Sequence, residues 1–359
     1  MPHLEVDKLN VVLTDFELKD INFSIEKGNV LSLLGASGAG KTTLIRAISG
    51  LIPITSGKVV VNGRVINDIP VHKRKIGMVF QDFALFPHLN VFGNISFGLK
   101  FNGLTKKQIK IEVEKLLELF GLKGYENRDV TSLSGGEKQR VALARTLAPK
   151  PEIILFDEPL SAIDEELRVK LREELASIQK QLGFTAIYVT HDRDEAFYLA
   201  DILGIFEDGK LIQIDKPQNV YNYPVSTSIA SFLGIENRLS AVVDSVYVDR
   251  YFGKINEDTT VAFKSKESLS IGESVELFIK PNTIHFIPKQ QIDEENCYQV
   301  SVIQRNEFGS KTEFILDFKG FKVKAMTLSD TSVLTDYNNV TISIDKEKLL
   351  VYKNGRLIS

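Results

Sequence analysis

The chain has 359 residues, of which 43% are hydrophobic and 25% charged, with a formal net charge of −3. This length exceeds one ordinary hydrophobic core and predicts two domains, while the near balance of charge argues against a nucleic-acid-binding protein. The single cysteine, Cys297, excludes an intrachain disulfide and a cysteine-cluster metal site. The sequence begins without a signal-peptide pattern, and no apolar run approaches the about 18 residues of a membrane span. Any membrane association is therefore expected to depend on a partner.

The first motif is a glycine-rich stretch between a predicted strand at residues 30–34 and a predicted helix after Lys41. Its spacing, G-x-x-x-x-G-K-T, is that of a phosphate-binding loop. Glycines let consecutive backbone N–H groups turn toward an anion, and the helix adds its positive end. We expect Lys41 between the β- and γ-phosphates of a nucleotide and the Thr42 hydroxyl on Mg²⁺. The expected nucleotide-binding residues are Gly35, Ala36, Ser37, Gly38, Ala39, Gly40, Lys41, Thr42 and Thr43.

Strands precede and follow this loop. Residues 4–34 alternate as edge strands do, residues 57–66 form a predicted hairpin with an Asn-Gly turn, and residues 76–80 form a strand that ends at Gln81. Between the last two lies the basic run Lys73-Arg74-Lys75, which suits either a solvated turn or phosphate contact.

From about residue 88 to 150 the pattern becomes helical. Thr105 and Gln108 form a capping box before an apolar helix face, and a second helix is expected between Gly136 and Leu147. Apolar strands then return at 153–156 and 185–190, with a helix between them that ends at Gly183. This alternation predicts a mostly parallel sheet covered on both faces, with a helical insertion at about 88–150.

After Gly234 the pattern changes to short strands separated by Gly, Asn, Asp and Pro turns. We expect a second, all-β domain of roughly 120 residues, folded as a small barrel. The predicted fold is therefore an α/β phosphate-loop cassette at residues 1–235, followed by an all-β, OB-like domain at residues 236–359.

Two further motifs carry the expected chemistry. Asp157 and Glu158 follow an apolar strand, where Asp157 would bind Mg²⁺ and Glu158 would orient and deprotonate a water. Ser134, Gly135, Gly136 and Glu137 open a helix and offer a second anion-binding end, which a nucleotide already held by the first loop does not need. An ordinary solvated turn and an ordinary helix cap are the alternatives.

In this order the motifs resemble the ATP-binding cassette ATPases over roughly residues 1–235. GASGAGKTT matches the phosphate loop, VFQD the Q-loop at Gln81, LSGGE the signature, IILFDEP the second nucleotide motif, SAID the D-loop ending at Asp164, and THD the H-loop at His191. The resemblance implies an ATPase that uses ATP and Mg²⁺, with Gln81 joining Thr42 and Asp157 at the metal.

The resemblance also implies a head-to-tail homodimer in which residues 134–137 act across the interface on the partner's ATP. Glu158 and His191 would be the catalytic pair. Members of the family usually stack adenine on an aromatic residue in the first strands. The positions available here are Val12, Leu13 and Phe16.

The segment QDFALFPHL and the β-rich domain, which is similar to TOBE domains, resemble the importer branch. The apolar patch at Phe83, Leu85 and Phe86 would receive an integral membrane permease, with ordinary core at the subdomain seam as the alternative. A solute-binding protein would act indirectly, and the ATPase would be peripheral on the cytoplasmic face. The sequence of the cassette looks most like that of importer subunits for ferric iron, or for an oxyanion such as molybdate or sulfate. A polyamine or sugar importer is the alternative.

Two other functions fit the sequence less well than import does. A soluble, non-transport cassette ATPase is the remote alternative, but such translation factors usually carry two cassettes and repair relatives carry long coiled coils, and neither occurs here. A binding-only regulator with a degenerate site conflicts with the intact Lys41, Asp157, Glu158 and His191.

Overall fold

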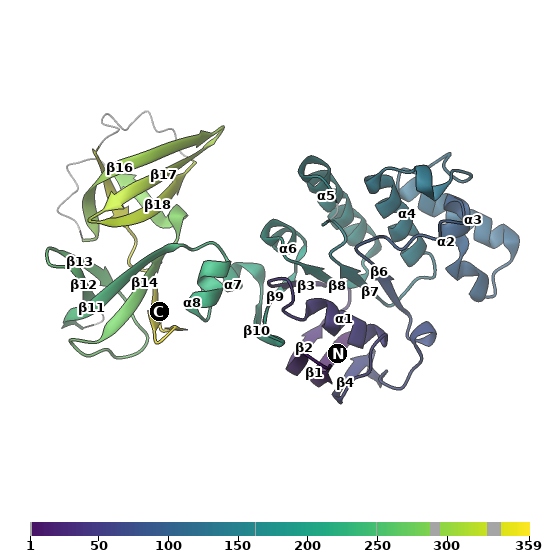
Figure 1. Cartoon of the computed structure of the whole chain (residues 1–359), viewed down its shortest axis with the longest axis horizontal. Coiled ribbons are helices and arrows are strands. Elements are labelled where there is room, and N and C mark those ends of the chain that lie inside the picture. Colours follow the sequence, from purple (N-terminus) through teal and green to yellow (C-terminus); the bar gives the residue numbers. More distant parts are fainter. Residues whose placement is uncertain (1, 162, 249, 288–294, 329–338) are drawn as a thin grey trace. The chain divides into compact units, whose positions relative to one another are not determined.

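The computed structural model describes residues 2–161, 163–248, 250–287, 295–328 and 339–359. They form two compact units, Met1–Val220 and Tyr221–Ser359 (Figure 1), which are described in turn. The functional division after residue 235 stays a prediction. No helix among the described residues is long and apolar enough to cross a membrane.

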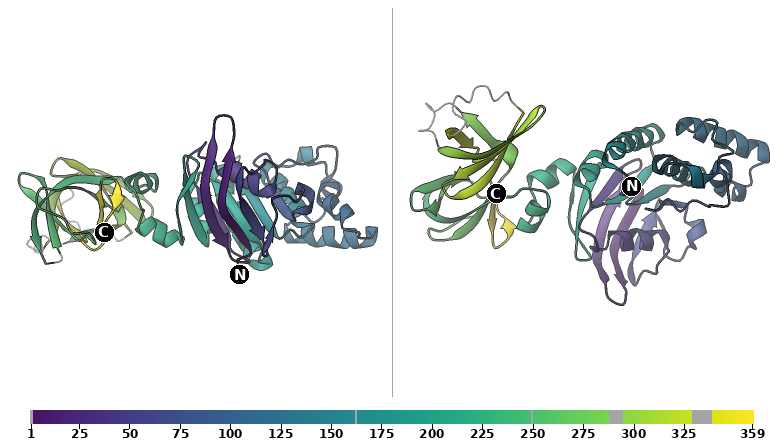
Figure 2. Two further views of the ribbon diagram at one scale, coloured as in Figure 1. Left: turned by 90° about the horizontal axis from the view of Figure 1, so that it is seen from below. Right: turned by 45° about the horizontal axis from the view of Figure 1, so that its top comes forward.

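The first unit is built on a six-stranded sheet whose central strands are parallel (Figure 2). Successive side chains of β7 and β8 enter two different hydrophobic cores, one on each face of the sheet. This double burial explains why their sequences are continuously apolar. The order is β10-β9-β3-β8-β7-β6, comprising β10 (Lys210–Asp215), β9 (Ile202–Glu207), β3 (Val30–Leu34), β8 (Thr185–Thr190), β7 (Ile153–Asp157) and β6 (Ile76–Val79).

An antiparallel sheet and α1 (Lys41–Ser49) cover one face of this sheet. The strands expected at its edge are partly interior, because β1 pairs with both β2 and β4. The predicted hairpin is confirmed, with Asn62 and Gly63 in the left-handed region at φ 49° and 74°. The order is β2 (Glu17–Ile25), β1 (Leu4–Val12), β4 (Ser56–Val61) and β5 (Arg64–Val65).

Helices cover the other face. The capping box of Thr105 and Gln108 and the left-handed helix end at Gly183 are present as predicted. Between β6 and β7 the chain forms α2 (Val91–Ser96), α3 (Lys106–Leu119) and α4 (Gly135–Leu147), with short 3₁₀ turns between them. The remaining helices of this unit are α5 (Glu165–Leu182), α6 (Arg193–Leu199) and α7 (Pro217–Asn222), which runs to the boundary with the second unit.

Beyond α7, the described residues of the second unit are all-β apart from α8 (Thr227–Phe232) and a 3₁₀ turn, which confirms the predicted class. Instead of one sheet, the strands form two, which share a core that includes Leu277, Phe314 and Ile342. The first sheet holds β13 (Thr259–Phe263), β12 (Arg250–Asn256), β11 (Asn237–Tyr247), β14 (Ser274–Ile279), β20 (Leu350–Lys353) and β21 (Arg356–Leu357). The second holds β15 (Ile284–Ile287), β19 (Asn339–Ile344), β16 (Cys297–Phe308), β17 (Lys311–Phe318) and β18 (Phe321–Thr327).

Arg74 corrects the interpretation of the basic run. Its side chain is buried and its guanidinium donates hydrogen bonds to the carbonyl oxygens of Ile48 at 2.8 Å and Asn67 at 2.7 Å, among others. It therefore holds the end of α1 against the following loop, and is neither a solvated turn residue nor a phosphate contact.

Candidate functional site

The glycine-rich loop runs from the end of β3 to the start of α1. A Cβ at Gly35 would lie 2.2 Å from the carbonyl oxygen of Phe206, and Gly40 has a φ of 109° that only glycine adopts readily. Packing against β9 and the backbone conformation therefore each require a glycine. The loop places the N-terminus of α1, with its unpaired backbone N–H groups, at the carboxyl edge of the parallel sheet.

Lys41 lies inside this loop and is only 4% exposed. Its ammonium donates to the carbonyl oxygens of Gly35 at 2.7 Å and Ala36 at 2.9 Å. Burial lowers the pKa of Lys41, against the opposing effect of the Glu158 and Asp157 carboxylates. These two bonds occupy two of the three ammonium N–H groups, so the third can reach an anion.

Thr42 and Asp157 meet beside the lysine, where the Thr42 hydroxyl donates to Oδ1 of Asp157 at 2.6 Å. Burial raises the pKa of Asp157, while the Thr42 hydrogen bond partly offsets this. The pair offers hydroxyl and carboxylate oxygens, the hard ligands that Mg²⁺ takes together with phosphate oxygens. No group of three or more His, Cys, Asp or Glu side chains suited to a metal occurs among the described residues, so a cation here would need oxygens from a ligand.

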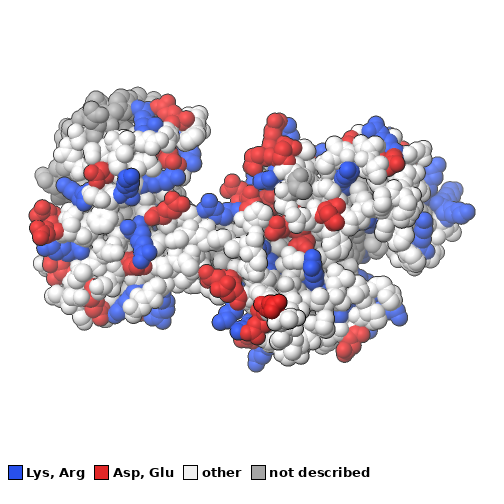
Figure 3. Space-filling view, viewed as in Figure 1, with Lys and Arg blue, Asp and Glu red and all other residues white. Residues whose placement is uncertain are grey.

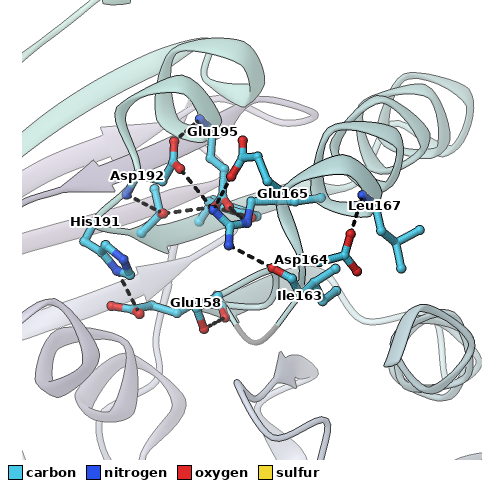
Figure 4. Close-up of polar contacts among 12 residues, drawn as sticks. Glu158, Ile163, Asp164, Glu165, Leu167, His191, Asp192 and Glu195 are labelled. Carbon is cyan, nitrogen blue, oxygen red and sulfur yellow. Dashed lines mark hydrogen bonds and ion pairs between the residues drawn. The ribbon is translucent and has the colours of Figure 1, made fainter. Parts of the chain in front are cut away.

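Glu158 and His191 form the next pair. Figure 4 shows the Glu158 carboxylate pointing toward the His191 ring, with Oε2 of Glu158 3.0 Å from Nδ1 of His191. Glu158 has a φ of 46°. Two hydrogen bonds fix its backbone: its N–H donates to the carbonyl oxygen of Val189, and its carbonyl oxygen accepts from the Ser161 hydroxyl. A strained, over-determined backbone of this kind is typical of functional positions.

The signature residues form a separate cluster at the start of α4. The Ser134 hydroxyl and the Glu137 carboxylate make a reciprocal capping box, and Tyr125 donates to Glu137 at 2.9 Å. Hydrogen bonds from the Ser134 backbone and the Tyr125 hydroxyl lower the pKa of Glu137. A Cβ at Gly136 would meet Leu167 at 3.2 Å, whereas one at Gly135 would meet nothing within 4 Å among the described residues. Gly135 therefore faces open space.

The structure unites some of the expected site residues and leaves others apart. No contact among the described residues joins 134–137 to the phosphate loop. Gln81 follows β6 with an exposed side chain. Asp164 caps α5 by accepting from the Leu167 N–H at 3.1 Å, and Ala162, which precedes it in the SAID motif, lies outside the described residues.

Phe83 is not part of an apolar surface after Gln81 but belongs to the core. It is 9% exposed and packs in a small core with Leu160 and Leu171. Phe86 is half-buried and lies against Phe97, with the ring centroids 4.6 Å apart and the rings tilted by 44°. Arg145 donates to the carbonyl oxygens of Phe83 and Ala84, both of which have positive φ. The segment after Gln81 is thus held in a strained turn by α4.

A cavity of about 640 Å³ adjoins the phosphate loop, with Val12, Leu13, Phe16 and Gly38 in its wall. Phe16 packs beneath the loop, since a Cβ at Gly40 would lie 2.5 Å from its ring. Val12 and Leu13 are 59% and 40% exposed. A flat ligand group in this cavity would therefore meet aliphatic side chains and one half-buried ring.

Three residues not expected from the sequence lie near the His191–Glu158 pair. Arg168 lies 3.7 Å from Asp192 and 4.0 Å from Glu195, two carboxylates on the segment that follows His191. Figure 4 labels both carboxylates beside His191. The available signal was the arginine four residues after the helix cap Asp164, together with two acidic residues shortly after His191. On the face shown in Figure 3, acidic and basic side chains of the described residues are interspersed.

Comparisons with known proteins agree with this geometry. The family described as ABC transporter matches residues 18–161. A protein named spermidine/putrescine import ATP-binding protein PotA, from Clostridium novyi (strain NT), is 41% identical over 274 residues, which are 76% of this chain and 77% of that protein. The solved structure of CbiO1 from Clostridium perfringens, described as part of the ABC transporter complex CbiONQ, superposes with a TM-score of 0.57 and 31% identity over 61% of this chain and 90% of that one. The chain therefore belongs to the ATP-binding cassette family of transport ATPases.

Proposed function

We propose that this chain is the ATP-hydrolysing subunit of an importer for polyamines, which energises uptake through a membrane permease. The choice of substrate is supported by the 41% identity to a spermidine/putrescine import protein. The comparisons give no support to ferric iron or the oxyanions, which the sequence of the cassette favours as substrates. The polyamine alternative is therefore the better hypothesis.

One observation carries the hydrolytic part: two polar pairs, Thr42 with Asp157 and Glu158 with His191, lie around the buried Lys41. The loop amides and Lys41 bind the phosphates of ATP. Thr42, Asp157 and Gln81 hold Mg²⁺, which neutralises charge on the phosphates when bound. Glu158 accepts a proton from the attacking water, and His191 orients Glu158 through Nδ1.

A second copy of the chain completes the site. The open space at Gly135 and the helix N-terminus behind Ser134 fit the γ-phosphate of an ATP held by the partner. ATP would then close a homodimer, and hydrolysis would open it. For the second unit we propose regulation of this dimer by a bound ligand, with a dimer buttress that binds nothing as the alternative.

The importer assembly follows from the same family. Phe86, Phe97 and Phe101, whose rings contact one another in tilted and edge-to-face pairs, offer an aromatic surface to a permease, and Phe101 is 77% exposed. The chain would then lie peripherally on the cytoplasmic face of the membrane, with a solute-binding protein as an indirect partner.

Uptake in cells that lack this chain tests the proposal. Radiolabelled spermidine, putrescine, ferric iron, molybdate and sulfate are each supplied to the deletion strain, complemented with the wild-type chain or with Glu158→Gln. We expect polyamine uptake alone to fall in the deletion strain, and only the wild-type chain to restore it. If the deletion strain took up polyamines normally but lost uptake of iron or an oxyanion, the assignment of polyamines as the substrate would be wrong.

A further inference from the structure

Arg168 lies one turn into α5, outside every motif identified from the sequence. Its guanidinium faces two chain segments that converge near the catalytic pair: the end of the D-loop at Ile163 and the segment that follows His191. We propose that Arg168 is a positioning residue that couples the D-loop to the His191–Glu158 pair. The proposal rests on the hydrolytic role given to His191 and Glu158 above.

The contacts of Arg168 are directional. One terminal nitrogen donates to the carbonyl oxygen of Ile163 at 2.8 Å. The other donates to Glu165 at 2.9 Å and lies 3.7 Å from Oδ2 of Asp192, the residue directly after His191. Nε lies 4.0 Å from Oε1 of Glu195. The guanidinium thus lies within 4.0 Å of four residues, two of them through hydrogen bonds, an arrangement that a lysine ammonium on a flexible stem cannot reproduce.

The residues that make these contacts are largely buried, which strengthens the interactions between them. The side chain of Arg168 is 23% exposed and that of Glu195 only 3%. Tyr188 and Thr190 donate to the other oxygen of Glu195 at 3.0 and 2.9 Å. Burial raises the pKa of Glu195, and the neighbouring Arg168 charge opposes that rise. A partly desolvated ion pair of this kind constrains its partners more than an exposed pair does.

The network continues directly to the catalytic pair. Asp192 caps α6 by accepting from the Glu195 N–H at 3.0 Å, and its own N–H donates to the Thr190 hydroxyl. Asp192, which Arg168 contacts, directly follows His191, and Thr190, which directly precedes His191, is hydrogen-bonded to Asp192 and to Glu195. Ile163, at the other end, lies just before the cap of α5. A displacement of the D-loop, for example when a partner copy packs against it, would move Arg168 and with it His191.

The test measures ATP hydrolysis and nucleotide binding by the purified full-length chain. We expect Arg168→Met to lower kcat by about 10- to 100-fold, because misplacement of a positioned group has costs of this size. The Kd for ATP should stay within about twofold of the wild type, since the phosphate loop is untouched. Arg168→Lys, which retains the charge but loses the fork, should recover only part of kcat.

A double variant separates positioning from simple charge neutralisation. Arg168→Met leaves the buried Glu195 carboxylate without this cation, and Glu195→Gln removes that carboxylate charge. We expect Arg168→Met/Glu195→Gln to regain Tm while kcat stays low. Recovery of kcat together with Tm would overturn the proposal, because Arg168 would then only neutralise Glu195.

Two controls complete the design. Lys170 pairs with Glu166 on an exposed part of the same helix, and Lys170→Met should leave kcat and Tm unchanged. His191→Ala tests the underlying hydrolytic assignment. Wild-type hydrolysis by His191→Ala would refute that assignment, whereas an inactive His191→Ala beside a fully active Arg168→Met would refute only the role of Arg168.

Discussion

The Thr42 hydroxyl donates a 2.6 Å hydrogen bond to Asp157, although 115 positions separate the two residues in sequence. The sheet explains this proximity. β3 precedes the phosphate loop, β7 ends at Asp157, and both pair in parallel with β8 between them. Their carboxyl ends therefore share one edge, which is where ligands bind in open α/β sheets.

Asp157→Asn should raise the Tm of the chain in the absence of Mg²⁺ and nucleotide. It should also reduce the further rise in Tm that Mg²⁺ and ATP produce. Burial raises the pKa of Asp157 in the folded state, so its ionised form opposes folding at neutral pH. Asparagine keeps the oxygen that accepts from Thr42. The gain in Tm should therefore be present at pH 7 and disappear as the pH falls below about 4, where unfolded aspartate is also protonated. Thermal unfolding from about pH 3 to 8, repeated with Mg²⁺ and ATP, measures both effects.

Gly135→Ala should retain the fold but lose ATP hydrolysis. A Cβ at this position meets no described residue within 4 Å, and alanine favours a helix more than glycine by about 1 kcal/mol. Its methyl group would instead obstruct the γ-phosphate delivered by a partner. Tm and steady-state hydrolysis are the measurements.

Gly98→Ala is the matched control, because its Cβ makes only ordinary contact with Pro149 at 3.5 Å. It should leave hydrolysis unchanged. If Gly135→Ala hydrolysed ATP as fast as Gly98→Ala, the space at Gly135 would have no role in the reaction.

Arg74→Met should destabilise the first unit by about 3–5 kcal/mol. Its guanidinium donates to two buried carbonyl oxygens at the end of α1 and to two part-buried ones in the loop at Asn67 and Ile69, and each loses its partner. Denaturant titration of the full chain measures the loss. The exposed neighbour Lys73 provides the comparison, since Lys73→Met should change stability by less than about 0.5 kcal/mol.

The elements and motifs of the first unit could be predicted because their signals are local. The Ser134–Glu137 and Thr105–Gln108 capping boxes join residues three apart, and the left-handed helix end at Gly183 depends on one residue. The order of loop and carboxylates along the chain likewise follows from alternating strands and helices.

The parts that escaped prediction depend on contacts between residues distant in sequence. Arg74 is buried because it reaches the end of α1, and Phe83 because α5 and the D-loop pack over it. The role of Arg168 depends on carboxylates that follow the next strand. Charge and hydropathy of single residues do not encode such partners. The same holds for the division of the β-strands into two sheets.

Val12→Tyr should tighten ATP binding by about 1–3 kcal/mol, the usual size of base–aromatic stacking. Val12 is 59% exposed in the wall of the cavity beside the phosphate loop, where an aromatic ring could lie against adenine. Calorimetric titration with ATP measures the change. Val65→Tyr, at a position 51% exposed on β5, should not alter the affinity. Equal affinities in the two variants would place adenine elsewhere.

The central claim is that one chain holds half a site and a second copy completes it. The most direct measurement is the molar mass of Glu158→Gln by light scattering, with and without Mg²⁺ and ATP, beside its rate of hydrolysis. Loss of the general base should slow hydrolysis by about 10²–10⁴-fold and trap a stable dimer only when ATP is present. A variant that stays monomeric with ATP and hydrolyses it at the wild-type rate would contradict the account.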